Sequence, residues 1–136
     1  MAKEETSTEQ PKTRWAIAPD WFQQSNRSIS ALIQSYLCPK CAKRLSAKRK
    51  MESPDAILSA IQDCCSRVPD FIHDRLPILE SIFRLFLANG NQPLDLEELG
   101  KRLSERRGGD PYRTSPETLS RLLKSDRYYG LREAKE

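Results

Sequence analysis

Apolar residues recur at helical spacing along most of the chain, and residues that favour turns separate the helices that this spacing predicts. Residues 29–37 are the first clear case, because their apolar side chains follow an i, i+3, i+4, i+7 pattern. Ser28 precedes them as a candidate cap for the helix N-terminus. Before this helix, residues 14–18 form only a short apolar patch built on Trp15 and Ile17.

Two further helices are predicted in the middle of the chain. The first starts with the Ser-Pro-Asp sequence of residues 53–55, which combines a capping serine, a proline at the first helical position and an early acid. Its apolar face includes Cys64 and Cys65 and continues to Val68. The second occupies residues 77–91 and ends in an Asn-Gly-Asn turn, whose residues tolerate a positive φ angle.

The last third of the chain predicts two more helices and a strand. A leucine stripe in residues 93–103 indicates a helix that Asp95 caps. The Gly-Gly-Asp-Pro sequence of residues 108–111 is a break. A Ser-Pro-Glu start and a second leucine stripe then predict a helix at residues 115–125, and residues 128–132 have the pattern of a short strand or hairpin arm.

This order of elements resembles the winged helix-turn-helix superfamily. The turn after the first helix carries the resemblance, with Phe-Leu-Ala-Asn-Gly-Asn-Gln-Pro-Leu-Asp-Leu-Glu-Glu-Leu at residues 86–99. The resemblance spans residues 76–133 and implies a mainly α domain with a short β wing, for which the sequence gives no clear second strand. We expect a disordered tail at residues 1–13, a helical cysteine-containing region at 14–75 and the winged-helix-like domain at 76–136.

The resemblance implies that the helix at residues 115–125 is a recognition helix, whose N-terminal part faces the major groove of DNA. Arg121 then has the position to pair with a guanine edge, and the other polar residues contact bases or phosphates. The expected nucleic-acid contacts are Arg106, Arg107, Arg113, Thr114, Thr118, Ser120, Arg121, Lys124, Arg127 and Arg132.

The net charge of the 136 residues is only +4, so the distribution of charge is more informative than its total. One basic patch contains no acidic residue and is either a phosphate-binding surface or a solvated loop. It consists of Lys40, Lys43, Arg44, Lys48, Arg49 and Lys50. No apolar run is long enough to span a bilayer, and no secretory signal is visible, so we expect a cytoplasmic protein whose cysteines are thiols or metal ligands.

Cys38 and Cys41 have the C-x-x-C spacing of half a zinc site. The sequence does not determine which residues form the second half of the site. Cys64 and Cys65 are adjacent, and neighbouring side chains on a helix diverge by about 100°, so both are awkward ligands for one zinc ion. One of them together with His73 completes a Cys3His set; alternatively, all four cysteines bind zinc at a distorted helix end, or an iron–sulfur cluster. Otherwise the second pair consists of buried core thiols.

The sequence favours a non-enzymatic protein. It has one histidine, no glycine-rich phosphate loop and no nucleophile elbow, and its acidic residues are scattered. We expect a nucleic-acid-binding protein, with DNA favoured over RNA, that acts as a transcription regulator or as part of a nucleic-acid complex and has a structural zinc. The alternative is an adaptor that docks on a larger protein or ribonucleoprotein assembly through Trp15, Trp21 and Phe22.

Overall fold

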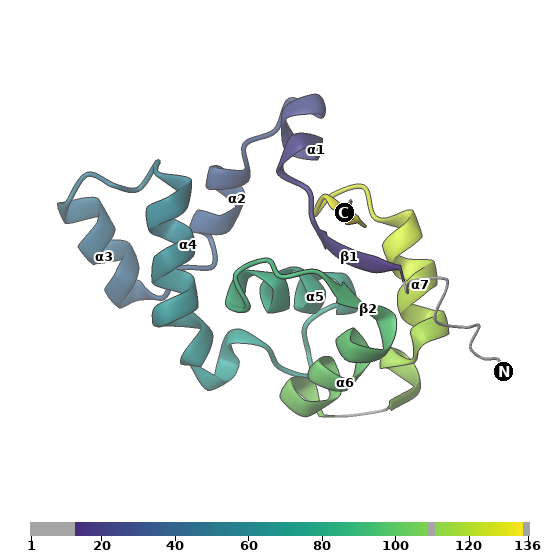
Figure 1. The fold of residues 1–136 in the computed structure, drawn as a ribbon. Helices are drawn as coiled ribbons and strands as arrows, with labels where there is room; N and C mark the ends of the chain where they lie inside the picture. Colours follow the sequence, from purple (N-terminus) through teal and green to yellow (C-terminus); the bar gives the residue numbers. More distant parts are fainter. Residues whose placement is uncertain (1–12, 109–110, 135–136) are drawn as a thin grey trace, which may run out of the picture.

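The computed structural model describes residues 13–108 and 111–134. Within these ranges the chain is mainly helical, as predicted, with a small antiparallel sheet (Figure 1). The helices are α1 (Pro19–Gln24), α2 (Ile29–Gln34), α3 (Pro39–Ala47), α4 (Pro54–Asp63), α5 (Ile78–Ala88), α6 (Leu96–Arg107) and α7 (Pro116–Ser125). The strands are β1 (Arg14–Ile17), β2 (Leu94–Asp95) and β3 (Leu131–Glu133). The tail expected at residues 1–13 lies outside the described residues, except for residue 13.

Local capping signals explain where most helices begin. The side chains of Ser28, Ser53 and Ser115 each accept a hydrogen bond from the backbone N–H three residues later, at the start of α2, α4 and α7. Asp95 does the same for α6. Each of these caps was predicted, because capping depends only on residues within one turn of the helix start.

Two elements differ from the expectation. The basic stretch that follows Cys38 is a helix, α3, which begins with Pro39 at its first position. The helix that starts at Pro54 does not continue to Val68: α4 ends at Asp63, and a short 3₁₀ turn, Cys65–Arg67, follows it. The break is at Cys64, whose φ of −134° and ψ of −63° lie outside the helical range.

The sheet joins the two ends of the chain. Its strand order is β2–β1–β3, and β1 pairs antiparallel with both neighbours, with Trp15 opposite Leu94 and Ile17 opposite Leu131. The side-chain amide of Asn91 also bonds to both backbone groups of Ile17, at 2.8 and 2.9 Å. The apolar patch at residues 14–18 is therefore the central strand of the sheet rather than a separate surface feature.

Helix α5 occupies the middle of the core and contacts α4, α6 and β1 (Figure 1). Ile82, Phe83 and Phe86 on this helix are fully buried. The Phe83 ring also lies between Tyr36 and Tyr129, with ring centroids 5.7 and 5.3 Å away, so an aromatic row links the segment after α2 to the segment before β3.

Helix α6 packs against α7, and at Gly100 it closely approaches the 3₁₀ turn Pro111–Thr114 that precedes α7. A Cβ atom at Gly100 would lie 2.5 Å from the backbone oxygen of Thr114, so no other residue fits there without a shift of the backbone. The leucine stripes of both helices are buried at this contact, as predicted, with Leu99, Leu103, Leu119 and Leu123 all in the core. Across the described parts of the chain, no helix combines the length and apolar character needed to traverse a bilayer.

Candidate metal centre and basic surfaces

The four cysteines come together at the N-terminus of α3. The ligand atoms of Cys38, Cys41 and Cys64 all lie within 4.8 Å of one another. The Sγ of Cys65 lies 3.3 Å from that of Cys38 and also accepts a hydrogen bond from the Cys38 backbone N–H at 3.1 Å. The break in the backbone at Cys64 explains how two adjacent cysteines can face the same place, since a continuous helix would have turned one of them away.

The electrostatics of this cluster favour a bound cation. Burial alone would raise the pKa of Cys38, but hydrogen bonds from the Cys41 backbone N–H and from the other three thiols lower it to about 7. Burial raises the pKa values of Cys41 and Cys65, and the neighbouring thiols add to this at Cys41. A second or third negative charge is therefore unfavourable in the bare cluster, and a metal ion would supply the compensating charge.

The spacing of the thiols also fits a metal ion. A tetrahedral site with zinc–sulfur bonds near 2.3 Å places its sulfur atoms about 3.8 Å apart. The Sγ atoms of Cys38 and Cys64 are 4.0 Å apart, while those of Cys38 and Cys65 are somewhat closer than this spacing. Cys38, Cys41 and Cys64 can hold a metal ion, whereas the Sγ of Cys65 is close to that of Cys38 but does not belong to the group of mutually close ligand atoms.

His73 is not part of the group of mutually close ligand atoms. Its ring Nδ1 accepts a hydrogen bond from the backbone N–H of Arg75, and its carbonyl accepts one from Arg107. Its contacts therefore belong to the turn before α5. The structure therefore brings together three cysteines, and it does not complete the Cys3His set with His73.

A second candidate surface is the outer face of α7. Arg121 and Lys124 on the helix are exposed, as are Arg113 before it and Arg127 after it. A groove of about 530 Å³ runs along this face between α7 and the start of α6, and Leu96, Pro116, Glu117, Ser120, Arg121 and Lys124 line it. Thr118 and Ser120 on the same helix are half-buried.

Arg107 and Thr114 do not fit the expected role in nucleic-acid contact. The Arg107 side chain is buried and donates to the carbonyl oxygens of His73, Asp74 and Leu76 and to the hydroxyl of Ser81. Its guanidinium thus fixes the turn before α5 from inside. Thr114 is also buried, and its hydroxyl lies 3.0 Å from that of Ser104.

The remaining expected arginines are closer to the surface. Arg106 is exposed and donates to the backbone oxygen of Ser66. Arg132 is half-buried; it donates to the backbone oxygen of Asp126 at 3.0 Å, and its guanidinium lies over the ring of Trp21. Both arginines can therefore reach a ligand only with part of their guanidinium groups.

Asp126 is a residue that the sequence did not single out, although it positions the segment between α7 and β3. Its buried carboxylate accepts hydrogen bonds from the backbone N–H groups of Tyr128, Tyr129 and Leu131, at 3.0, 3.0 and 2.9 Å. Asp126 is the residue after the last turn of α7, so it fixes the angle at which β3 leaves the helix. An Asp whose side chain can bond to the backbone two residues on, followed closely by a glycine, is the local signal for such a turn.

The basic patch of the sequence lies on and just after α3, and all six of its side chains are exposed. None of the six has an ion pair with another described residue. In contrast, the tryptophan and phenylalanine side chains expected to dock on a partner are largely internal: Trp15 and Phe22 are buried, and only Trp21 is half-exposed. A docking surface made of all three does not exist in this fold.

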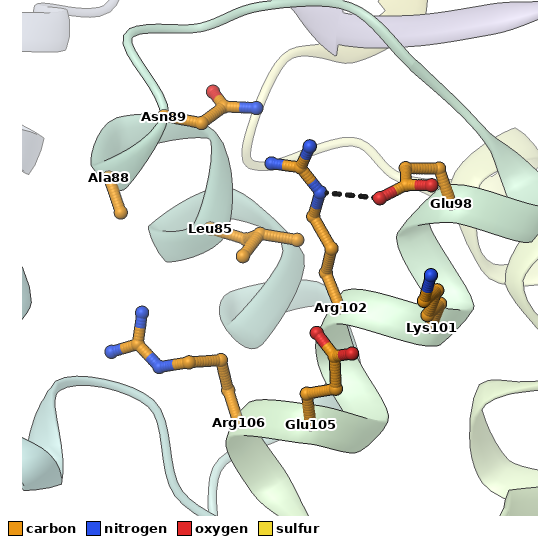
Figure 2. Close-up of a pocket in the computed structure, with 8 residues that line it drawn as sticks. All are labelled: Leu85, Ala88, Asn89, Glu98, Lys101, Arg102, Glu105 and Arg106. Atoms are coloured by element: carbon orange, nitrogen blue, oxygen red, sulfur yellow. Dashed lines mark hydrogen bonds and ion pairs between the residues drawn. The ribbon is translucent and has the colours of Figure 1, made fainter.

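A third surface feature is a groove of about 460 Å³ between the end of α5 and α6 (Figure 2). Arg102 and Glu98 form an ion pair across one turn of α6, at 2.8 Å, and Lys101, Glu105 and Arg106 extend from the same helix. Basic and acidic side chains alternate around this groove, so it does not present a single sign of charge. It has neither the converging thiols of the first site nor the mainly basic rim of the second.

Comparison of the chain with protein-family models, with curated proteins and with solved structures finds no match.

Proposed function

We propose that this chain is a small, non-enzymatic DNA-binding protein with a winged helix-turn-helix fold and a structural zinc centre made of four cysteines. One observation carries the proposal of DNA binding: α7 is packed on α6 by a buried leucine stripe and turns an exposed face with Arg121 and Lys124 outward. A helix held in this way is suited to enter the major groove, where an arginine recognises guanine through two hydrogen bonds.

The arrangement of the sheet supports the winged-helix interpretation. A wing requires a strand that pairs with the one after the recognition helix, and β1 occupies that place beside β3. The missing second wing strand is thus supplied from the start of the chain. The charges around α7 add to the support, because Arg113 and Arg127 lie at its two ends, where phosphates pass on either side of a major groove.

The zinc proposal is supported by the donor set. Four thiols within one cluster match the ligands of structural zinc sites, which are closed and use sulfur and nitrogen atoms. The position of Cys38 at the N-cap of α3 adds the positive end of a helix dipole, which stabilises a thiolate there. The metal would connect α3 to the end of α4 and so reinforce the attachment of α3, which has only two buried side chains.

DNA binding is tested by fluorescence anisotropy with a labelled random duplex at two salt concentrations. We expect binding at low salt that weakens steeply as salt rises, because phosphate contacts release counterions. Arg121→Gln together with Lys124→Gln should weaken it, whereas Arg67→Gln together with Lys101→Gln, an equal change of charge at exposed positions away from α7, should have little effect. Absence of binding by the native chain at low salt, or an equal loss in both variants, would exclude the proposal.

The metal centre is tested by elemental analysis of chain purified without added metal. We expect about one zinc ion per chain. Cys38→Ser, Cys41→Ser and Cys64→Ser should each lose it, Cys65→Ser should bind it more weakly, and His73→Ala should retain it. Loss of zinc in the histidine variant would replace the four-thiol site by a Cys3His site, and a metal-free native chain would rule out both.

A further inference from the structure

We infer that α3 carries a second contact for nucleic acid, so that one folded chain bridges two DNA segments, one bound at α7 and the other at α3. The inference rests on the proposed DNA binding by α7. It adds a separate site and a different outcome, namely the joining of two duplexes instead of the occupation of one.

The charge around α3 is of one sign. No acidic residue occurs between Asp20 and Glu52, a stretch that contains seven basic residues. Six of these are the exposed patch on and after α3, and the described residues provide no carboxylate that pairs with them. Cations concentrated on and just after one short helix, with no carboxylate partner among the described residues, repel one another. A polyanion such as a phosphodiester backbone relieves this repulsion.

The outer face of α3 is free to make such a contact. Of the residues in this helix, only Cys41 and Leu45 are buried. The cysteine cluster holds the N-terminus of the helix, and the two buried side chains hold its inner face. The lysines at positions 40 and 43 and the residues after the helix end therefore point away from the protein core.

At the end of α3, an arginine occupies a backbone conformation that favours glycine. Arg49 has a φ of +57° and stands where the chain leaves the helix, with the N–H of Lys50 bonded to the oxygen of Leu45. At the same point after α5 the chain has Gly90, with a φ of +74° and a corresponding bond from Asn91 to Phe86. Glycine adopts this conformation without strain, so an arginine here keeps a positive charge at the expense of a less favourable backbone.

The two basic surfaces lie at opposite ends of the molecule. Figure 1 shows α3 beside α4 at one side and α7 at the other, with α5 between them. A duplex seated along α7 therefore leaves α3 free, and each surface is available to its own DNA segment.

The test is a bridging assay with the full zinc-loaded chain and two short duplexes of random sequence, one labelled with a donor fluorophore and one with an acceptor. An α3 variant combines Lys40→Gln, Lys43→Gln and Lys48→Gln; it leaves Arg44 in place because Arg44 donates to the Sγ of Cys41. The control carries the same loss of charge elsewhere, with Arg67→Gln, Arg75→Gln and Lys101→Gln at exposed positions. Circular dichroism and zinc content verify that both variants are folded.

We expect energy transfer between the duplexes with the native chain and with the control, and its loss with the α3 variant. The α3 variant should still bind a single duplex through α7. Arg49→Gly should also weaken bridging without harming the fold. If the native chain binds one duplex but gives no energy transfer, the inference is wrong and the proposed function stands; if it binds no duplex, both are wrong. Bridging that persists in the α3 variant, as self-association of the chain would produce, also overturns the inference.

Discussion

Replacement of Asp126 by alanine is expected to destabilise the fold strongly, because one buried carboxylate organises the whole segment between α7 and β3. The residue is 3% exposed, and its two carboxylate oxygens accept three backbone hydrogen bonds of 3.0, 3.0 and 2.9 Å. The guanidinium of Arg132 lies 3.7 Å from one of these oxygens. Truncation removes the acceptor from all three N–H groups at once.

The size of the effect follows from how well water can replace the carboxylate. Leu131 is completely buried, so its N–H loses its partner without compensation, which costs about 1–3 kcal/mol. Tyr128 is half-exposed and Tyr129 is half-buried, so their N–H groups recover part of their bonding from water. The sum is about 3–5 kcal/mol, a large part of the stability of a domain of this size.

Urea denaturation followed by circular dichroism measures this loss. The midpoint should fall by about 2 M for Asp126→Ala at a typical slope, and by less for Asp126→Asn, which keeps the shape and one acceptor oxygen. Asp70→Ala is the matched control, because Asp70 is exposed, and it should change stability by less than about 0.5 kcal/mol. If the two alanine variants unfold at the same urea concentration, the carboxylate does not hold the segment as argued.

The other predictions concern the helix contact, the end of α3 and the metal. Gly100→Ala should destabilise the chain by about 2 kcal/mol despite the better helix propensity of alanine, because the new Cβ meets the oxygen of Thr114 at 2.5 Å. The control is Lys101→Ala, at the next position on an exposed face, which should not change stability. Equal melting temperatures of the two variants would contradict this prediction. Arg49→Gly should stabilise the chain by about 0.5–1 kcal/mol through relief of its left-handed backbone, and a lower melting temperature would refute the strain. If the proposed metal is bound, its removal by a chelator should release α3, because a nine-residue helix with two buried side chains does not persist alone. Hydrogen exchange should then rise at residues 39–47 and remain slow in α5, and unchanged exchange in α3 would contradict the proposal that a metal connects α3 to α4.

The sequence predicted the features that depend on neighbouring residues. The caps at Ser53 and Ser115, the glycine turn after α5 and the leucine stripes of α6 and α7 all lie where expected, because each is determined within one or two turns of helix. The C-x-x-C pair also lies in a group of three cysteines that could hold a metal ion. What the sequence left open was the second pair, since nothing local to Cys64 indicates that α4 breaks there.

The expected role of Arg107 was wrong, and the spacing of the apolar residues in α6 could have shown this. Basic residues in the last turn of a helix are usually exposed to solvent, and both Arg106 and Arg107 were expected to contact nucleic acid. However, Arg107 continues the spacing of Leu99 and Leu103, four residues apart on the buried face of α6. A helical stripe that ends in arginine indicates a buried guanidinium with carbonyl partners, which is how the structure uses it.

The sequence could not predict the central strand of the sheet, for a different reason. This strand also makes the C-terminal elements depend on residues near the start of the described chain. Three successive residues of β1, Trp15, Ala16 and Ile17, are buried, so the strand lacks the alternation that marks one exposed face. Its partners lie near residues 94 and 131, far along the chain, and only the completed fold brings them together. Without β1, both β2 and β3 lose their only strand neighbour among the described residues, and the fully buried Leu131 loses its cover. The helix that we propose to read DNA is thus supported by a strand from the opposite end of the sequence, and the fold of the C-terminal elements requires residues 14–17.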